Sequence, residues 1–258
     1  MTPLLADLAA QAGDALWGAV AVFLRIGAAV ALLPAFGEAT VPMRVRLGLA
    51  LGLTAILYPA VAGSLPPAMP ADAVPWHLFA TEPVAGLALG AVARLMLVVL
   101  AYAGTIAAQS TSLSQLFGGS AGEPMAAMGH VMVTAGLALA CTAGLHVQVV
   151  AALIRSYEVL PAGTFPVAGD LTAWGVGRIG QALGIGLALA APFVLASLVY
   201  NVALGVINRA MPQLMVAFVG APAITLGGLV LLALTVPAAL MAWRDWAEAL
   251  LAQPFTLP

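Results

Sequence analysis

Two arginines interrupt long apolar runs of the sequence, where a charged side chain is costly. Arg25 and Arg94 each have mostly apolar neighbours on both sides. A charge at membrane depth must face protein or water and have a partner. Asp14 is too far along its helix to reach Arg25, so we expect the partner of Arg25 to be an acid brought in by folding, such as Glu38, or one on another subunit. Because no relay of Asp, Glu or His accompanies either arginine, we predict structural intramembrane charges and ion pairing rather than an ion path.

Side chains that could bind a metal or catalyse a reaction are few. His130 and His146 are the histidines nearest to each other in sequence. On one continuous helix they would lie about 24 Å apart on nearly opposite faces and could not share a metal. No carboxylate pair, Ser-His-Asp set or cysteine cluster stands at a useful spacing. Lysine is absent, which excludes phosphate-loop and Schiff-base lysines. We therefore expect no enzyme, no metal site and no cofactor.

The most polar uncharged stretch is AQSTSLSQLFGGSAGEP, at 108–124. Its hydroxyl and amide side chains precede a glycine pair, and such a composition can satisfy non-helical backbone at membrane depth. Irregular backbone there is tolerated only when it is buried in protein or lines a wet cavity. The stretch therefore indicates a loop lying in a pore. An ordinary solvated turn is the alternative, because turns also use glycine and serine.

The composition shows what kind of elements must position these residues. Hydrophobic residues make up 63% of the 258 residues and charged residues 7%, and the mean hydropathy is +1.10. Soluble domains have roughly 45–50% apolar and about 25% charged residues, so the chain is a membrane protein in contact with lipid. The net charge of −2 and the scattered arginines provide no basic stripe for a nucleic acid.

Apolar windows predict an all-α integral membrane protein that forms one helical domain over 1–258. A helix needs about 20 apolar residues to cross a hydrocarbon core of roughly 30 Å. Most of the windows are longer than this, so we expect helices that are tilted, bent or projecting beyond the bilayer. Six windows meet the criterion, near 15–35, 44–62, 78–108, 125–155, 176–207 and 213–242.

Small residues recur four apart in three of these segments, as Gly48 and Gly52, Gly86 and Gly90, and Gly180 and Gly184. This spacing lets helix backbones approach closely in a membrane. The pattern leaves open whether the glycines pack within the chain or against other subunits.

The last two apolar segments are joined by the stretch NRAMPQLMVAFVGAP, at 208–222. Pro212 ends one helix and starts the next, and Arg209 can extend its charge to a membrane interface. Asn208 and Gln213 can satisfy the backbone groups that the turn leaves free. The stretch therefore predicts a tight helical hairpin.

Three ordered motifs carry a resemblance to a known family. The hairpin stretch resembles the arginine, proline, glutamine and valine-glycine-x-proline signature of the FliR family of flagellar biosynthesis proteins, which falls here on Arg209, Pro212, Gln213, Gly220 and Pro222. FLRIGAAVALLPAFGEATVPMRVRLGLALGLT, at 23–54, is similar to the family's amino-terminal pattern. HVQVVAALIRSYEVLPAG, at 146–163, is similar to its central segment. The export protein of type III injectisomes is a close relative of this family.

The resemblance implies a core channel-forming subunit of the flagellar type III export gate, which passes unfolded flagellar substrates across the bacterial inner membrane. It implies a fold of about six long helices arranged as hairpins, a FliP-like portion followed by a FliQ-like hairpin, in a multi-pass protein of the flagellar basal body. The implied partners are FliP-like and FliQ-like membrane subunits and FlhB-like and FlhA-like export components.

The resemblance also assigns roles to two sets of residues. The hairpin corner is implied to contact partner subunits near the channel entrance. The polar loop matches the position of the family's channel plug, with apolar stoppers and glycine hinges. The plug residues are Gln115, Leu116, Phe117, Gly118, Gly119 and Ser120.

A six-helix transporter of small molecules or ions is the alternative function. In that case the polar loop would be the substrate site. Transporters usually place intramembrane charges or paired broken helices at such a site, and this sequence has one polar loop without a counterpart in its other half. The sequence therefore favours protein export.

Overall fold

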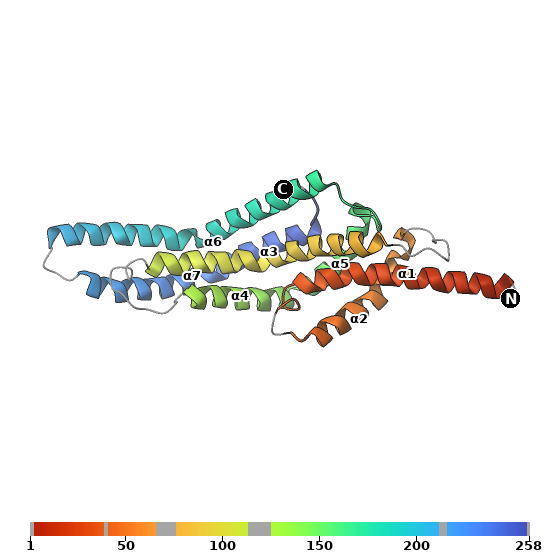
Figure 1. The fold of residues 1–258 in the computed structure, drawn as a ribbon. Helices are drawn as coiled ribbons and strands as arrows, with labels where there is room; N and C mark the ends of the chain where they lie inside the picture. Colours follow the sequence, from red (N-terminus) through yellow and green to blue (C-terminus); the bar gives the residue numbers. More distant parts are fainter. Residues whose placement is uncertain (1–2, 39–40, 66–75, 113–124, 212–215, 257–258) are drawn as a thin grey trace. The chain divides into compact units, whose positions relative to one another are not determined.

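The computed structural model describes residues 3–38, 41–65, 76–112, 125–211 and 216–256 (Figure 1). Every regular element within these ranges is a helix, which confirms the all-α class. The helices are α1 (Pro3–Leu32), α2 (Met43–Val61), the short 3₁₀ helix η1 (Ala62–Ser64), α3 (Leu78–Ser112), α4 (Met125–Thr142), α5 (Leu145–Val159), α6 (Ala168–Ala210) and α7 (Val216–Ala252).

Five of these helices are long and apolar enough to cross a membrane, namely α1, α2, α3, α6 and α7. A sixth candidate arises only if α4 and α5 are counted together as one broken span. The six predicted segments therefore correspond to the observed elements, but the fourth segment is not one helix.

The break between α4 and α5 corrects the prediction of a continuous segment over 125–155. Gly144 has φ of 77°, in the left-handed region that L residues with a side chain rarely adopt. A glycine in this conformation is a common way for a helix to end. His130 and His146 consequently belong to different helices, so the spacing of a single helix does not apply to them.

α6 and α7 are longer than their apolar windows. α6 has 43 residues, which at 1.5 Å per residue corresponds to about 65 Å. A hydrocarbon core is about 30 Å thick, so α6 must tilt, bend or extend beyond the bilayer. Pro192 lies inside α6, and Pro222 and Pro237 lie inside α7. Membrane helices tolerate such prolines because neighbouring groups satisfy the freed carbonyls.

The chain forms two compact units. The first contains residues 1–94, 144–178 and 250–258, and the second contains 95–143 and 179–249. Three helices, α3, α6 and α7, continue from one unit into the other. The single domain over 1–258 stays a prediction, because this division concerns contacts and not independent folding.

In the first unit, α1 packs against α2 (Figure 1) and also closely against α3. A Cβ atom added at Gly86 would collide with the carbonyl oxygen of Arg25. One added at Gly90 would lie 2.8 Å from the carbonyl oxygen of Ala29. Both glycines of this pair therefore pack within the chain, because only a residue without a side chain lets α3 approach α1 this closely.

In the second unit, Trp243 of α7 is fully buried and its indole Nε1 donates to the Met96 carbonyl oxygen of α3 at 2.8 Å. An indole N–H that is buried in this way needs such a partner. Gly104 of α3 and Gly129 of α4 bring their backbones into close contact. The core of this unit is thus a set of closely packed helices with one tryptophan as an anchor.

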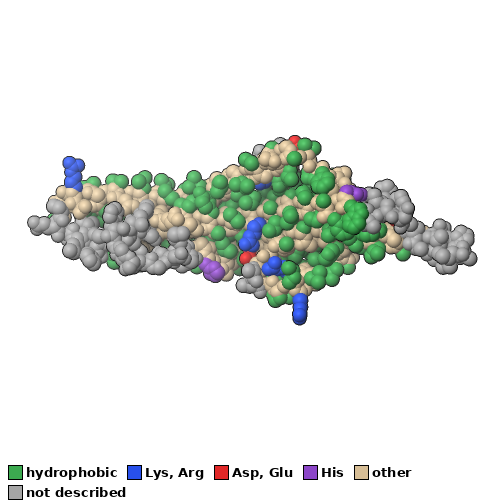
Figure 2. Space-filling model, in the orientation of Figure 1, with side chains coloured by type: hydrophobic (Ala, Val, Ile, Leu, Met, Phe, Trp, Pro, Cys, Tyr) green, Lys and Arg blue, Asp and Glu red, His purple; other side chains and the backbone are tan. Residues whose placement is uncertain are grey.

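Large apolar side chains are exposed over much of the chain. Figure 2 shows hydrophobic side chains spread over the visible face, with charged groups as isolated spots. Contiguous exposed apolar surface of this kind indicates contact with lipid or other proteins. On α6 and α7 the exposed side chains include Leu195, Leu198, Val199, Val202, Val206, Leu226, Leu229, Val230 and Leu234.

Candidate functional site

A buried ion pair joins α1 to α3 in the first unit. Arg25 Nε donates to Glu82 Oε2 at 2.8 Å, and the two side chains are only 1% and 0% exposed. The other guanidinium nitrogens donate to the Ser156 hydroxyl at 3.1 Å and to the Leu160 carbonyl oxygen at 2.9 Å. Each nitrogen of the cation therefore has an acceptor, which a buried charge requires.

The Tyr157 ring completes the surroundings of the cation. The guanidinium carbon of Arg25 lies 3.8 Å from the centre of this ring, within the range of a cation–π contact. Tyr157 and Ser156 both belong to α5 and both are buried. Arg25 thus connects α1 simultaneously to α3 and α5.

The second oxygen of Glu82 fixes the turn after α5. Glu82 Oε1 accepts from the backbone nitrogen of Gly163 at 2.9 Å. Gly163 has φ of 78°, so this turn needs a glycine. We name Arg25, Glu82, Ser156, Tyr157 and Gly163 the polar junction. It connects three helices and one turn through a compensated pair of charges.

The structure places Glu82, and not Glu38, beside Arg25. In the sequence, Glu82 could be assigned to the connectors because it lies close to the start of the third apolar segment. The feature that could have identified Glu82 as the partner of Arg25 is that this glutamate is the fifth residue of a long apolar helix. Tyr157 and Gly163 lie inside the family-like central motif, but nothing in their spacing indicated that they would meet Arg25.

Glu38 instead contacts two other arginines of the first unit. Its carboxylate pairs with Arg94, and its backbone carbonyl accepts from Arg46. The Arg94 and Glu38 side chains are 39% and 35% exposed. An ion pair at this exposure contributes about 0–1 kcal/mol. Arg94 therefore differs from Arg25, although both were predicted as intramembrane charges.

Two arginines of the first unit lie around the end of α7. Arg178 Nη2 donates to the carbonyl oxygens of Gln253 at 3.0 Å and Thr256 at 2.6 Å. Arg155 Nη1 donates to the Ala252 carbonyl oxygen at 2.6 Å. The last carbonyls of a helix lack partners inside the helix and carry a partial negative charge. We name Arg155, Arg178 and Trp174 the C-terminal clamp.

Trp174 contributes to the clamp through both ends of its side chain. Its Nε1 donates to the Pro254 carbonyl oxygen at 2.9 Å. Its ring stacks on Phe255 with 5.8 Å between the ring centres. No sequence motif indicates this cluster, because its acceptors are backbone groups.

The structure describes part of the hairpin signature. Arg209 is exposed in the last turn of α6, and Pro222 is exposed within α7. Gly220 is buried, and its carbonyl oxygen accepts from the Tyr200 hydroxyl at 2.7 Å. This hydrogen bond joins α6 to α7 near the corner. Pro212 and Gln213 lie outside the described residues.

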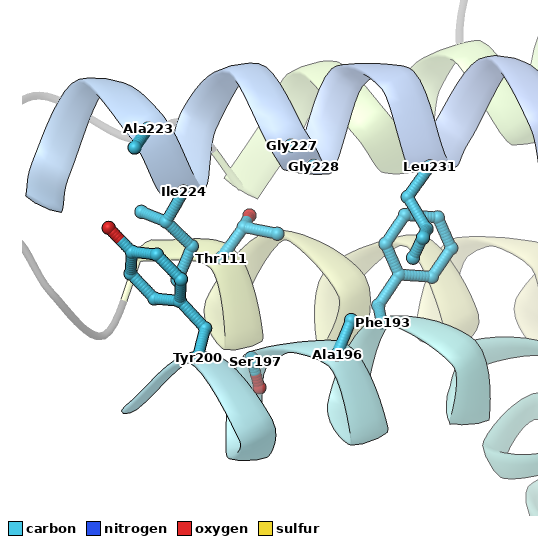
Figure 3. A pocket seen from close by; sticks show the side chains of 10 residues that line it. All are labelled: Thr111, Phe193, Ala196, Ser197, Tyr200, Ala223, Ile224, Gly227, Gly228 and Leu231. Carbon is cyan, nitrogen blue, oxygen red and sulfur yellow. The ribbon is translucent and has the colours of Figure 1, made fainter. Parts of the chain in front are cut away.

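Beside this bond, α6, α7 and the end of α3 enclose a partly open pocket of about 200 Å³ (Figure 3). Its hydroxyl groups all donate to backbone carbonyls: Ser197 to Val194, Thr111 to Ala108 and Tyr200 to Gly220. Phe193, Ile224 and Leu231 form apolar walls. The lining therefore presents mainly hydrocarbon and has no uncommitted hydroxyl donor.

The plug residues, Gln115 to Ser120, lie outside the described residues, so their role stays a prediction. Within the described ranges, no three His, Cys, Asp or Glu side chains are grouped closely enough to hold a metal ion.

The sequence matches the family described as Bacterial export proteins, family 1, over residues 16–250. It is 34% identical over 237 residues to the flagellar biosynthetic protein FliR of Caulobacter vibrioides, which covers 90% of this chain and 94% of that protein. The FliR protein of Escherichia coli is 29% identical over 223 residues, with 83% and 82% covered.

A third relative gives the same result. The FliR protein of Bacillus subtilis is 27% identical over 206 residues, which cover 78% of this chain and 79% of that protein. Residues 16–250, which match the family, contain the polar junction, the C-terminal clamp and the hairpin signature. The resemblance seen in three sequence motifs therefore extends along nearly the whole chain, and the chain belongs to the FliR family of bacterial flagellar export proteins.

Proposed function

We propose that this chain is a core, channel-forming and non-enzymatic subunit of the flagellar type III export gate in the bacterial inner membrane. The observation that carries the proposal is the full-length match to proteins named flagellar biosynthetic protein FliR. In this role the chain helps to pass unfolded flagellar substrates across the membrane. The chain contributes by packing against its neighbours, because it forms part of the channel wall.

The unoccupied helix faces support a role in a larger assembly. A Cβ atom added at Gly48, Gly52, Gly180 or Gly184 would meet none of the described residues within 4 Å. The space beside Gly86 and Gly90, in contrast, is occupied by α1 of the same chain. Two of the three glycine pairs thus leave α2 and α6 open to close approach by another helix. This is the arrangement expected of a subunit.

The proposed neighbours are FliP-like and FliQ-like membrane subunits, with FlhB-like and FlhA-like components at the channel entrance. The hairpin corner at Arg209 supports such a contact, because Arg209 is exposed and Val206 and Ile207 of α6 beside it are exposed as well. The polar junction has a different role in the proposal. It holds the amino-terminal helices in the geometry that the assembly needs.

The loop that contains Leu116 and Phe117 is proposed as the channel plug, on the basis of the family resemblance. Deleting residues 117–120 should raise the passive ion leak of the reconstituted assembly without changing its subunit content. Ion flux in liposomes measures the leak. A leak equal to that of the unaltered assembly would remove the plug from the proposal.

A secretion experiment in cells tests the proposed function. A strain that lacks this chain should retain flagellar substrates in the cytoplasm, and a plasmid copy should restore their export. Export is measured as hook and filament protein in the culture medium. If export is normal without the chain, and a small solute instead fails to cross the membrane, the transporter alternative replaces the proposal.

A further inference from the structure

The two arms of the helical hairpin, α6 and α7, have little apolar packing within the chain. Only 28% of the apolar window of α6 and 11% of that of α7 is buried against the described residues. Between membrane helices the surrounding lipid is as apolar as the side chains, so apolar contact alone gives a weak preference for one alignment. A polar bond between the arms can therefore decide how α6 is aligned with α7.

Tyr200 makes such a bond. Figure 3 shows its ring extending from α6 towards α7, and its hydroxyl donates to the Gly220 carbonyl oxygen at 2.7 Å. The hydroxyls of Ser197 and Thr111, which line the same pocket, each donate to a carbonyl oxygen of their own helix. Of these three hydroxyls, only that of Tyr200 joins one helix to another.

Gly220 makes room for this contact. A Cβ atom added at Gly220 would lie 3.3 Å from the Tyr200 hydroxyl oxygen and 3.2 Å from Leu204 Cδ1. Tyr200 and Leu204 are four residues apart, on one face of α6, and both lie against the same point of α7. The absence of a side chain at Gly220 thus lets α7 receive a tyrosine and a leucine of α6 together.

The contact fits one alignment of the two helices. A slip of one residue along α7 would move the accepting carbonyl by about 1.5 Å along the helix axis and by about 100° around it. The Tyr200 hydroxyl would then face a different backbone group. Leu204 would lose the place that a glycine provides, because neither sequence neighbour of Gly220 is a glycine.

The hydrogen bond lies close to the hairpin corner. Tyr200 is nine residues before Arg209, about 14 Å along α6, and α7 begins at Val216, four residues before Gly220. Arg209 and Val206 are both exposed. The alignment of Tyr200 with Gly220 therefore also sets where these exposed side chains lie relative to α7.

We propose that Tyr200 is a positioning residue for assembly. Its hydroxyl fixes the register of α6 against α7 and so presents the hairpin corner at Arg209 to a neighbouring subunit. This inference rests on the proposed function, in which the corner is a partner contact. Tyr200 acts through the corner, because its own bond is made within the chain.

Spin labels on the two arms test the register directly. Leu195 and Leu234 are exposed, so both can be changed to labelled cysteines once the exposed Cys141 is replaced by alanine. They are not level with each other across the hairpin, so a slip changes the distance between them. Pulsed EPR on the full chain should give one narrow distance distribution. Tyr200→Phe, which keeps the ring, should broaden it or shift it by up to about 5 Å, the rise of one helical turn.

The yield of co-purified subunits, measured without labels, tests the positioning role. Tyr200→Phe should lower this yield about threefold, which corresponds to ~0.6 kcal/mol for an average hydrogen bond between membrane helices. Gly220→Ala is a second variant, because it keeps the hydroxyl but presses a methyl group against it. It should change the label distance and the subunit yield in the same direction.

Two controls separate the register from general stability. Ser197→Ala removes a hydroxyl of the same pocket that donates within α6, so it should change neither the label distance nor the subunit yield. Trp243→Phe breaks another hydrogen bond between helices of the second unit, the one to Met96. It should lower the unfolding temperature and leave the label distance unchanged.

The positioning role is overturned if Tyr200→Phe keeps the label distance of the unaltered chain. It is also overturned if the distance changes while the subunit yield stays equal to that of Ser197→Ala. An unaltered chain that purifies without companions would instead refute the proposed function, and the positioning role with it. Companions that Tyr200→Phe retains in full would refute the positioning role alone.

Discussion

The Arg25 guanidinium and the Glu82 carboxylate, 57 residues apart in sequence, meet at 2.8 Å with both side chains closed to solvent. The Ser156 hydroxyl accepts from Arg25 and donates to the Leu153 carbonyl oxygen, and the Gly163 backbone nitrogen donates to Glu82. The junction therefore behaves as one unit, since removing either charge leaves the other buried without compensation. Its contribution can be separated experimentally from that of ordinary packing.

Removing one member of the pair should be strongly destabilising. We expect Arg25→Met or Glu82→Gln to lower the free energy of unfolding by about 3–5 kcal/mol, because an unpaired charge or its unsatisfied partners remain buried. Replacing both, as Arg25→Met with Glu82→Met, should recover much of this loss. Thermal unfolding in detergent measures the effect.

Glu248→Gln is the control for the ion-pair prediction. It breaks the exposed pair with Arg244 within α7, and such a pair contributes about 0.2–0.5 kcal/mol. If Glu82→Gln is no more destabilising than Glu248→Gln, the polar junction is not a stabilising unit.

Gly86→Ala should destabilise the contact between α1 and α3. A methyl group at this position would collide with the Arg25 carbonyl oxygen, and backbone cannot yield as a flexible side chain can. We expect a lower unfolding temperature and weaker protection of α1 from proteolysis. Gly48→Ala is the control, because its Cβ would meet nothing within 4 Å. Equal unfolding temperatures for the two variants would contradict the close approach.

Gly180→Leu combined with Gly184→Leu should impair assembly rather than folding. A Cβ atom at either position would meet none of the described residues within 4 Å, so we expect the isolated chain to keep its unfolding temperature. In the proposed assembly they would separate α6 from a neighbouring helix. The yield of co-purified subunits measures the effect. An unchanged yield would assign this face of α6 to lipid.

Arg178→Gln should loosen the end of α7. The Arg178 side chain is buried, and its loss leaves the Gln253 and Thr256 carbonyls without this donor. Hydrogen bonds to a charged group contribute about 1.5–3 kcal/mol, so the unfolding free energy should fall by about 2 kcal/mol. Arg155→Gln, at an exposed position with one carbonyl contact, should cost less. The reverse order would contradict the clamp.

The sequence predicted the fold class and the family because both depend on local patterns. Apolar windows identified the membrane segments, and three motifs carried the resemblance. The windows underestimated α6, which begins at Ala168 rather than near 176. Hydropathy marks the part of a helix that suits lipid, whereas the helix itself also includes the polar residues Asp170 and Thr172 before that part.

The sequence could not predict the contacts of the polar junction. Arg25 was conspicuous because it stands in an apolar run, but its partner depends on which helices pack together. Arg25 and Gly163 are distant in the chain, and only the tertiary arrangement brings both to the carboxylate of Glu82. The break at Gly144 was also hidden, because a glycine within an apolar run is equally compatible with a continuous membrane helix.

We propose that this chain works as one subunit of a protein-conducting assembly. The decisive experiment is native mass spectrometry of the chain, extracted from its own membrane under mild conditions. We expect one defined hetero-oligomer that contains this chain with FliP-like and FliQ-like subunits. A monomer or homodimer that is fully active in the cell without companions would contradict it.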